Sequence, residues 1–381
     1  MKIVDVKTLV ARGLTIKNWV LVKIVTDEGV YGIGDPGGGN KALTAAACVN
    51  DMARLLIGQD PRRIQHIWQM LRKNAFSQGT VIDSAVSGID MALWDILGKS
   101  LGAPVYQLLG GAVRDRLRVY ASGFSSGART LEQLQANAAA AVKEGYTALK
   151  FTPVGPADDG TTLERTFAKQ AVARVRAVRE AVGDDVDIAL DFHGRLLPQE
   201  SIPLLRMLEE YHPWFVEEPV LQHDVGALAQ ISASTSIPIA TGERLRTKYE
   251  FHELVSRRAC SILQPDPHCG GVFELRMIAA MAEARYMSVI PHQAGSPVNA
   301  AAALQLAACT PNVLCVEHFE SFASGRDGFL REPIVVRNGY VDLPTGPGLG
   351  IDVDEQFVQA NPYKPVDYPV WLREDGTVTD W

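Results

Sequence analysis

The sequence predicts an α/β protein in which an α+β domain precedes a (β/α) barrel. Three observations support this prediction: the first 115 residues are strand-rich and then helix-rich, a βα repeat follows them, and ionisable residues recur through that repeat. The recurring residues are separated by 26, 26, 23, 26 and 25 positions: Asp191, Glu217, Glu243, Asp266, His292 and Glu317. About 25 residues is the length of one strand, one helix and two short loops. Each of the six closes a short apolar run, so we expect them at the carboxyl ends of barrel strands, where barrel active sites lie.

Composition and charge argue against several classes of protein. The chain has 381 residues, of which 47% are hydrophobic and 21% charged, and these values are typical of a two-domain globular protein. A net charge of −7 argues against a nucleic-acid partner. No apolar run reaches the 18 residues needed to span a membrane, and charges early in the chain argue against a signal peptide. The five cysteines lack paired spacing, so we expect them to be reduced thiols. Together these features lead us to expect a cytoplasmic protein without nucleic-acid or membrane partners.

Residues 1–115 have the pattern of an α+β domain. Residues 20–25 are strand-like, turn at 27–29 and return through 30–32, which predicts a β-hairpin. Three helical segments are expected after it, over 42–57, 64–72 and 84–101. Residues 32–37 spell GxGxxG, but the preceding strand belongs to an antiparallel hairpin and no helix opens directly after the motif. We therefore do not interpret it as a dinucleotide site.

The barrel is expected over residues 116–319. Its first two strands are predicted at 117–121 and 148–151, joined by a helix over 131–144. An insertion rich in proline and glycine precedes the next helix, and the evenly spaced repeat then begins. Residues 320–381 contain short strands and turns without another βα unit, so we expect this segment to pack back on the first domain.

Three carboxylates at consecutive strand ends, those of Asp191, Glu217 and Glu243, form an all-oxygen set of candidate metal ligands. Hard oxygen ligands favour Mg²⁺ over zinc. A single carboxylate at a strand end is more often solvated or caps a helix, and the metal interpretation depends on the three occurring together. His193 follows Asp191 by two residues and therefore shares its face of the strand. There it can act as an acid or as a hydrogen-bonded neighbour of a ligand.

Further residues at the predicted barrel mouth fit acid–base chemistry. Asp266 and His292, at adjacent strand ends, fit a carboxylate that orients an imidazole base. Glu317 on the next strand can bond an anionic oxygen of the substrate if it carries a proton. Lys150 and Thr152 share one face of the second strand. Together with a divalent cation, these groups are suited to removing a proton next to a carboxylate and stabilising the enediolate.

Several long segments are similar to the enolase superfamily, mandelate racemase subgroup, and occur in the same order along nearly the whole chain. They are SAVSGIDMALWDILGKSLGAPVYQLLGG (84–111), FVEEP (215–219), TGER (241–244), LQPDPHCGG (263–271), PHQAGSPV (291–298) and VEHFE (316–320). The resemblance implies a modified (β/α)7β TIM-like barrel with an α+β N-terminal capping domain that the C-terminal tail completes. The corresponding boundaries are 1–115, 116–319 and 320–381.

The resemblance also assigns roles to residues at the barrel mouth. It implies that Mg²⁺ is held by Asp191, Glu217 and Glu243, with Glu217 rather than Glu218 as the ligand. It implies Asp266 and His292 as the dyad that acts as the base, and Glu317 as the electrophilic acid. Lys150 is expected to supply a cation near the substrate carboxylate or the metal cluster.

One departure from the racemases bears on the reaction. The racemases carry Lys-x-Lys at the end of the second strand, whereas this chain has Lys150-Phe151-Thr152 and so lacks a base on the opposite face of the substrate. Residues 191–195, Asp-Phe-His-Gly-Arg, resemble instead the acid-sugar dehydratases of the D-galactonate dehydratase type, in which the histidine expels the 3-hydroxyl. The C-terminal residues 371–381 are also similar to the tails of sugar-acid dehydratases.

We therefore expect a lyase that dehydrates an acid sugar, a galactonate-like aldonate, to a 2-keto-3-deoxy sugar acid with Mg²⁺. The alternatives are an epimerase or sugar-lactone cycloisomerase of the same superfamily, and a non-enzymatic carboxylate-binding barrel. A zinc hydrolase is disfavoured because no His-x-His pair closes an early strand. We also expect a homo-oligomer.

Substrate specificity is expected to depend on two loops of the first domain, by analogy with the family. These loops are Leu14–Trp19 and Asn74–Gln78, and Trp19 and Phe76 are candidates to shape the pocket, although core packing is the commoner role of such aromatic residues. Arg195 fits a distal carboxylate if the substrate is a diacid, and a surface salt bridge is the alternative.

Overall fold

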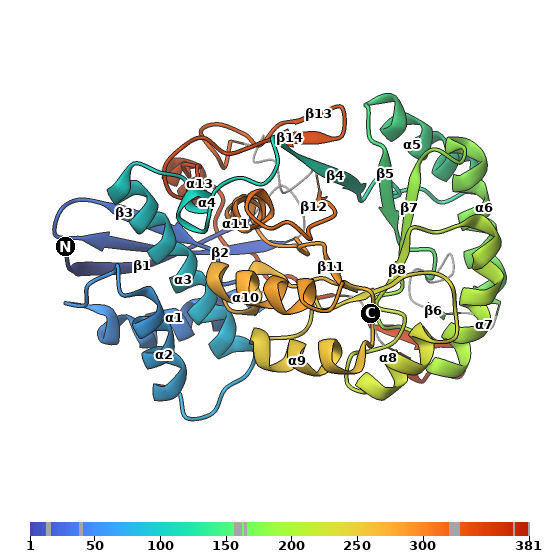
Figure 1. The fold of residues 1–381 in the computed structure, drawn as a ribbon, viewed down its shortest axis with the longest axis horizontal. Helices are drawn as coiled ribbons and strands as arrows, with labels where there is room; N and C mark the ends of the chain where they lie inside the picture. The colour runs from blue at the N-terminus through green and yellow to red at the C-terminus, as the bar shows by residue number, and fades with distance from the viewer. Residues whose placement is uncertain are drawn as a thin grey trace.

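The predicted hairpin forms part of a three-stranded antiparallel sheet in the computed structural model, which describes residues 1–12, 17–37, 41–155, 162–163, 166–319, 328–368 and 370–379. The sheet has the order β1-β2-β3 and lies at one end of the molecule (Figure 1). Its strands are β1 (Ile3–Arg12), β2 (Asn18–Thr26) and β3 (Tyr31–Gly34). The helices of this capping domain are α1 (Ala42–Leu56), α2 (Ile64–Asn74), α3 (Thr80–Leu101) and α4 (Val105–Leu108).

The GxG part of the GxGxxG segment lets β3 pack closely against α3. A Cβ atom at Gly32 would lie 2.0 Å from the Ala92 carbonyl oxygen, and one at Gly34 would lie 1.8 Å from the Gly88 carbonyl oxygen. Side chains at these two positions would collide with the helix backbone. The two glycines therefore serve strand–helix packing, in agreement with the rejection of a dinucleotide site.

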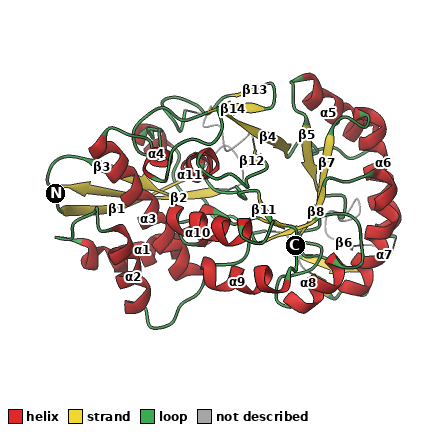
Figure 2. Cartoon of the chain, in the orientation of Figure 1, coloured by secondary structure: helices red, strands yellow, loops and turns green. Residues whose placement is uncertain are grey.

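The second domain is a barrel of eight parallel strands and seven intervening helices among the described residues, which confirms the predicted (β/α)7β architecture (Figure 2). Its strands are β4 (Arg116–Ser122), β5 (Ala148–Phe151), β7 (Asp187–Asp191), β8 (Phe215–Glu217), β9 (Ile239–Thr241), β10 (Ile262–Leu263), β11 (Ser288–Val289) and β12 (Val316–His318). Its helices are α5 (Leu131–Lys143), α6 (Phe167–Val182), α7 (Pro198–Leu208), α8 (Val225–Ser232), α9 (Thr247–Arg257), α10 (Val272–Glu283) and α11 (Pro297–Ala308). The barrel closes where β12 pairs with β4 and Val313 bridges to Val289.

The barrel interior explains the spacing of four of the six recurring ionisable residues, Asp191, Glu217, His292 and Glu317; Glu243 and Asp266 follow the layer positions Gly242 and Gln264 by one and two residues. One residue from each strand or its immediate end contributes to a buried apolar layer: Tyr120, Ala148, Ala189, Phe215, Ala240, Ile262, Ile290 and Cys315. Side chains two residues apart point to the same face of a strand. The positions two residues further on therefore form the next layer, at the barrel mouth: Ser122, Lys150, Asp191, Glu217, Gly242, Gln264, His292 and Glu317. Five of the eight are ionisable, and this layer is the floor of the candidate site.

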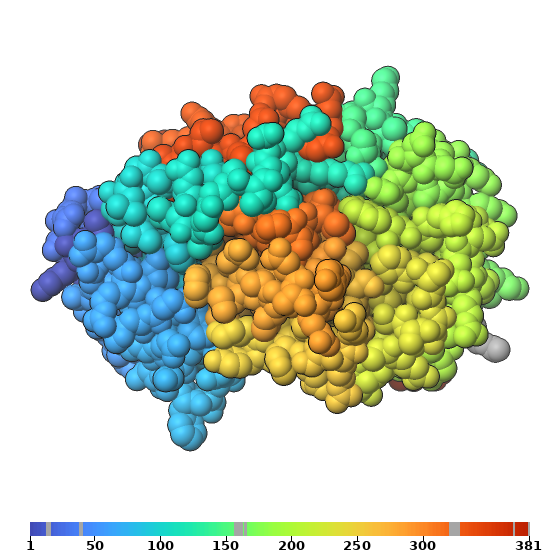
Figure 3. Space-filling model, in the orientation of Figure 1, coloured from blue at the N-terminus to red at the C-terminus, as the bar shows by residue number. Residues whose placement is uncertain are grey.

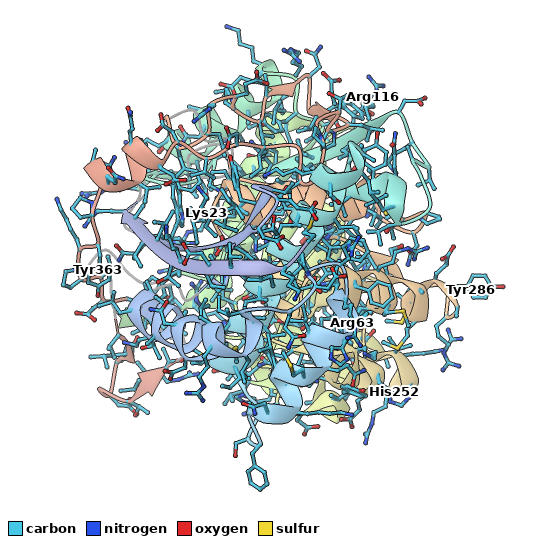
Figure 4. All side chains as sticks on the ribbon, turned by 90° about the vertical axis from the view of Figure 1, so that its left-hand side faces the viewer. Lys23, Arg63, Arg116, His252, Tyr286 and Tyr363 are labelled. Atoms are coloured by element: carbon cyan, nitrogen blue, oxygen red, sulfur yellow. The ribbon has the colours of Figure 1, made fainter. Side chains whose placement is uncertain are left out.

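The C-terminal segment contacts both domains. Residues 344–364 lie against the capping domain: Tyr31 Oη donates to Asp352 (2.9 Å), and Lys23, labelled in Figure 4, pairs with Glu355 of α13 (Glu355–Ala360). The strands around this stretch contact the barrel instead. They are β13 (Val336–Arg337) and β14 (Tyr340–Asp342) beside β4, and β15 (Trp371–Arg373) and β16 (Val378–Thr379) beside β6 (Thr162–Leu163).

The sequence led us to expect only the contact between the tail and the capping domain. In Figure 3 the segment appears in orange-red along one edge of the molecule, beside both domains. The expected packing on the first domain also included residues 320–327, which lie outside the described ranges. No helix within the described ranges is long and apolar enough to cross a membrane. The five cysteines are free thiols.

Candidate active site

A cavity of about 400 Å³ lies between the barrel mouth and the capping domain. The barrel lines it with Glu243, Asp266 and His292, and the capping domain contributes residues such as Lys17 and Trp19. A six-carbon sugar acid fits this volume, which lies at the lower end of the usual range for ligand pockets. The cavity therefore brings the predicted base to the place where a substrate can bind.

Lys150 on β5 is the centre of the buried charges on the barrel floor. Its Nζ lies 2.6 Å from Glu217, 2.8 Å from Glu317 and 3.5 Å from Asp191. Burial opposes the charged form of Lys150, but Glu217 and Glu317 outweigh it and hold its pKa well above the ordinary value. The ammonium group therefore compensates part of the negative charge on the floor. The role predicted for Lys150 from the sequence stays a prediction.

Asp266 and His292 form the predicted dyad. His292 Nδ1 lies 2.7 Å from Asp266 Oδ2, which leaves Nε2 facing Glu243 at 3.0 Å and Glu317 at 3.7 Å. Burial lowers the pKa of His292, but Glu243 and Glu317 outweigh it, and the pKa lies well above its ordinary value. The ring therefore presents Nε2 to the barrel mouth, and Asp266 fixes its orientation from behind.

His193 lies on the opposite wall of the mouth. It follows β7, and the sheet order β11-β10-β9-β8-β7 places three strands between it and His292. Its backbone has φ 51°, and its N–H donates to Asp191 Oδ1 at 2.8 Å. The ring lies between Thr152 Oγ1, 3.3 Å from Nδ1, and Asp191 Oδ2, 3.2 Å from Nε2. A left-handed backbone at a non-glycine residue is a form of strain often found at active sites.

Glu217 and Glu218 are consecutive but point to different places. Glu217 lies on the barrel floor, whereas Glu218 adopts φ 45°, accepts a hydrogen bond from the Thr241 hydroxyl and faces Arg244. Burial raises the pKa of Glu218 to about 7. Glu217 thus lies beside Lys150 on the barrel floor, whereas Glu218 lies beside Arg244, and the choice of Glu217 as the ligand stays a prediction.

The donor set at the floor fits a divalent cation. Atoms of Glu217, Glu243 and His292 lie within 4.8 Å of one another. Glu217 Oε1 is buried and has no hydrogen-bond partner among the described residues. Burial and the nearby Asp191 raise the pKa of Glu217 well above its ordinary value. A cation at these oxygens would satisfy Oε1 and offset the crowded negative charge.

This grouping differs from the predicted set of three carboxylates, because His292 takes the place of Asp191. Asp191 is the register partner of Glu217 in the adjacent strand, but its oxygens are engaged by His193 and Lys150. The assignment of Asp191 as a ligand stays a prediction.

Glu317 is surrounded by donors. Its Oε1 accepts hydrogen bonds from Ser122 (3.2 Å) and Lys150 (2.8 Å), and its Oε2 accepts one from the Gln293 backbone N–H (3.0 Å). Glu317 therefore joins the β4, β5 and β11 sides of the mouth.

The structure revises the expectations for the specificity loops. Trp19 lines the cavity, but the side chain of Phe76 is 97% exposed and does not line it. Leu14 lies outside the described residues. Arg195 is buried rather than in a surface salt bridge: it donates to the Val154 carbonyl oxygen at 2.6 Å and stacks on Trp371.

Four residues to which the sequence analysis gave no individual role line the cavity: Lys17, which lies in the predicted specificity loop, and Asp35, Arg246 and His268. Lys17 Nζ donates to the Ala294 carbonyl oxygen at 3.2 Å, beside the loop after His292. Arg246 follows Glu243 by three residues, and this proximity was the available signal for it. No periodic pattern connects the four, because two come from the capping domain and two from loops of the barrel.

Comparisons with known proteins agree with this architecture. Residues 7–110 match the mandelate racemase / muconate lactonizing enzyme, N-terminal domain, and residues 133–357 match the enolase C-terminal domain-like family. The D-galactonate dehydratases of Variovorax paradoxus and Ralstonia nicotianae are each 40% identical over 374 residues, which cover 95% of this chain and 96% of theirs.

Solved structures are similar over the same length. A member of the enolase superfamily from Salmonella Typhimurium has a TM-score of 0.90 at 31% identity, covering 95% of this chain and 98% of that one. A mandelate racemase/muconate lactonizing enzyme-like protein from Roseovarius sp. TM1035 has a TM-score of 0.87 at 35% identity, covering 96% of both chains. The chain therefore belongs to the enolase superfamily, with the capping domain of the mandelate racemase and muconate lactonizing enzymes on an enolase-type barrel.

Proposed function

We propose that this protein dehydrates a sugar acid, a galactonate-like aldonate, to a 2-keto-3-deoxy sugar acid. The observation that carries the proposal is the placement of two imidazoles on opposite sides of the barrel mouth, His292 after β11, where it lines the cavity, and His193 after β7. Relatives at 40% identity named D-galactonate dehydratase support the same reaction class. Thr152 occupies the position where a second lysine base would be needed for racemisation.

Asp191, Glu217 and Glu243 are the residues proposed to hold Mg²⁺, which when bound supplies Lewis-acid stabilisation of the charge that develops on the substrate carboxylate. Lys150 and Glu317, 2.8 Å apart, lie beside these carboxylates. We assign them to the other carboxylate oxygen of the substrate, where Glu317 bonds the oxygen if it carries a proton and Lys150 adds positive charge.

His292 is the proposed base. Because Nδ1 faces Asp266, Nε2 is the nitrogen that faces the barrel mouth, and it takes the proton from C2 when the ring is in its neutral form. The electron pair of the C2–H bond moves into the carboxylate and gives the enediolate. Asp266 keeps the ring oriented and stabilises the imidazolium that results.

His193 is the proposed acid. A proton from its ring goes to the C3 hydroxyl, the C3–O bond breaks and water leaves, while the enediolate electrons form a C2–C3 double bond. The resulting enol takes up a proton at C3 and loses the proton of its C2 hydroxyl, which gives the 2-keto-3-deoxy acid, so that the net change is the loss of one water. Asp191 and Thr152 hold the ring at this position.

The same two imidazoles also fit an epimerase or a lactone cycloisomerase, in which His193 acts as the second proton carrier. A sugar-acid library, incubated with the protein and Mg²⁺, separates the readings through semicarbazide detection of 2-keto acids. We expect a 2-keto acid from at least one aldonate. Conversion without a new carbonyl would favour the epimerase or cycloisomerase, and tight Mg²⁺ binding without any turnover would favour a carboxylate-binding barrel.

A further inference from the structure

A chain of buried polar groups connects the capping domain to the proposed base. Asp35, just after β3, lies 3.2 Å from His268 Nε2, and His268 Nδ1 lies 2.9 Å from Asp266 Oδ1. The other oxygen of Asp266 binds His292 Nδ1 at 2.7 Å. Two imidazoles therefore share one carboxylate, and the second imidazole is held from the capping domain.

The site around His268 is shaped to fit an imidazole ring. A Cβ atom at Gly295 would lie 2.7 Å from His268 Cε1, and one at Gly37 would lie 3.1 Å from the ring. Asn299 Nδ2 lies 2.9 Å from both His268 Nε2 and Asp266 Oδ1. The ring thus fills a slot that side chains at either glycine would narrow.

Asp35 also binds the loop that follows the base. Its Oδ2 accepts a hydrogen bond from the Ser296 N–H at 2.8 Å, and its Oδ1 accepts one from the Gly37 N–H at 2.7 Å. Ser296 caps α11, four residues after His292. The Asp35 carboxylate is therefore linked to the base by two routes. One route passes through His268 and Asp266, and the other passes through the backbone of the loop after His292.

Charge supports this arrangement. Burial alone would lower the pKa of His268, but Asp266 and Asp35 outweigh it and raise the pKa to about 9. Burial alone would raise the pKa of Asp35, but His268 outweighs it and the pKa is lowered. A cationic imidazole between two carboxylates forms charge-assisted hydrogen bonds, which are stronger than neutral ones.

We propose that Asp35 and His268 are positioning residues for His292, so that the base is aligned only while the capping domain is docked on the barrel. This inference rests on the proposed function for its catalytic consequence. His268 fixes the rotation of the Asp266 carboxylate, and Asp266 fixes the ring that faces C2. A displacement of the base by about 1 Å can lower the rate on the order of 10²-fold, even when the substituted residue lies far from the reacting atoms.

The matched control is Asp90 on α3. It is a second buried carboxylate of the capping domain, and its Oδ2 accepts a hydrogen bond from the Val272 N–H of the barrel at 2.8 Å. It joins the same two domains, and its hydrogen bond goes to the start of α10 rather than to His268 or His292. Comparing Asp35→Asn with Asp90→Asn therefore separates the loss of positioning from a general loosening of the domain contact.

The first measurement uses ¹H–¹⁵N spectra of protein labelled at the histidine ring nitrogens, with His268→Gln and His292→Asn to assign the signals. We expect Asp35→Asn to shift the ring signals of both His268 and His292, and Asp90→Asn to shift neither. Unchanged His292 signals in Asp35→Asn would overturn the proposal. The spectra need no substrate and therefore test the positioning proposal separately from the proposed function. If the His292 signals shift as expected but the protein dehydrates no sugar acid, only the proposed function is wrong.

The second measurement is the kinetics of Asp35→Asn and His268→Gln with substrate deuterated at C2. We expect kcat to fall about 10- to 10²-fold with little change in KM, and the deuterium isotope effect on kcat to rise because proton removal becomes slower. Partial unfolding would lower the amount of active enzyme without changing the isotope effect. An isotope effect equal to that of the wild type in both variants, or a kcat within twofold of the wild type, would contradict the proposal.

Discussion

The two walls of the barrel mouth hold their histidines differently. On the β11 side, His292 is 14% exposed and is bound to a carboxylate that is itself fixed by His268, Asn299 and a backbone N–H. On the β7 side, His193 is 23% exposed, and its ring lies 3.3 Å from Thr152 Oγ1 and 3.2 Å from Asp191 Oδ2. One ring is supported through several layers of side chains, and the other is held by its nearest neighbours.

This difference matches the two proposed tasks. A base that removes a weakly acidic proton needs close alignment and a stabilised imidazolium, because the barrier of that step depends on both. The acid acts in the later step, in which the C3 hydroxyl is already departing as the C2–C3 double bond forms. We therefore expect changes behind His292 to affect the whole reaction, and changes around His193 to affect only the second half.

The largest effect is expected where the two walls meet, at the barrel floor. Glu217→Gln removes a carboxylate that we propose as a Mg²⁺ ligand, and several kcal/mol of stabilisation from a bound cation corresponds to a loss of roughly 10³-fold or more. Both C2 hydrogen exchange and dehydration should be lost, and calorimetry should show weaker Mg²⁺ binding. Glu218→Gln is the control, and equal losses in the two variants would contradict the assignment of Glu217.

The next effect is expected on the His292 wall. Asp266→Asn replaces the carboxylate that orients the base, so dehydration and C2 exchange should fall together by roughly 10²-fold or more. Rates of both processes, measured by NMR on the same sample, check this. If dehydration fell while exchange stayed at the wild-type rate, Asp266 would belong to the acid half of the reaction.

The smallest effect is expected on the His193 wall. Thr152→Val removes one hydrogen-bond partner of the ring, and a bond worth about 0.5–1.5 kcal/mol corresponds to a loss of about 2- to 10-fold. Only dehydration should slow, with C2 exchange unchanged. A steady-state assay beside the exchange measurement tests this, and a loss as large as that of Asp266→Asn would remove the contrast between the walls.

The sequence could predict the floor of the site because the barrel imposes a period on it. Each strand places an apolar residue in one layer and, two positions later, a residue at the mouth, so that Asp191, Glu217 and His292 follow Ala189, Phe215 and Ile290. That regularity is local to each strand and can be read without the tertiary structure. The choice of Glu217 over Glu218 as the ligand needed the family resemblance, because the two residues are adjacent in the sequence.

Contacts between distant segments could not be predicted in this way. Asp35 and His268 are 233 positions apart in the chain and meet only because the capping domain docks on the barrel. Phe76 was a candidate for the pocket from its position in a loop, but the loop directs its side chain to solvent. Likewise, the short strands of the tail carry no signal for the domain that each one joins, and β14 and β15 pair with the barrel.

The most direct test of the account is NMR of a sugar acid incubated in D₂O with Mg²⁺ and either His292→Asn or His193→Asn. We expect both variants to lose dehydration by roughly 10² to 10⁴-fold, because each lacks a positioned acid or base. His193→Asn should still exchange the C2 hydrogen for deuterium, since His292, Asp266 and the floor of the site remain, whereas His292→Asn should not. Exchange that survived in His292→Asn and was lost in His193→Asn would reverse the two roles, and dehydration near the wild-type rate in His193→Asn would contradict the two-wall mechanism.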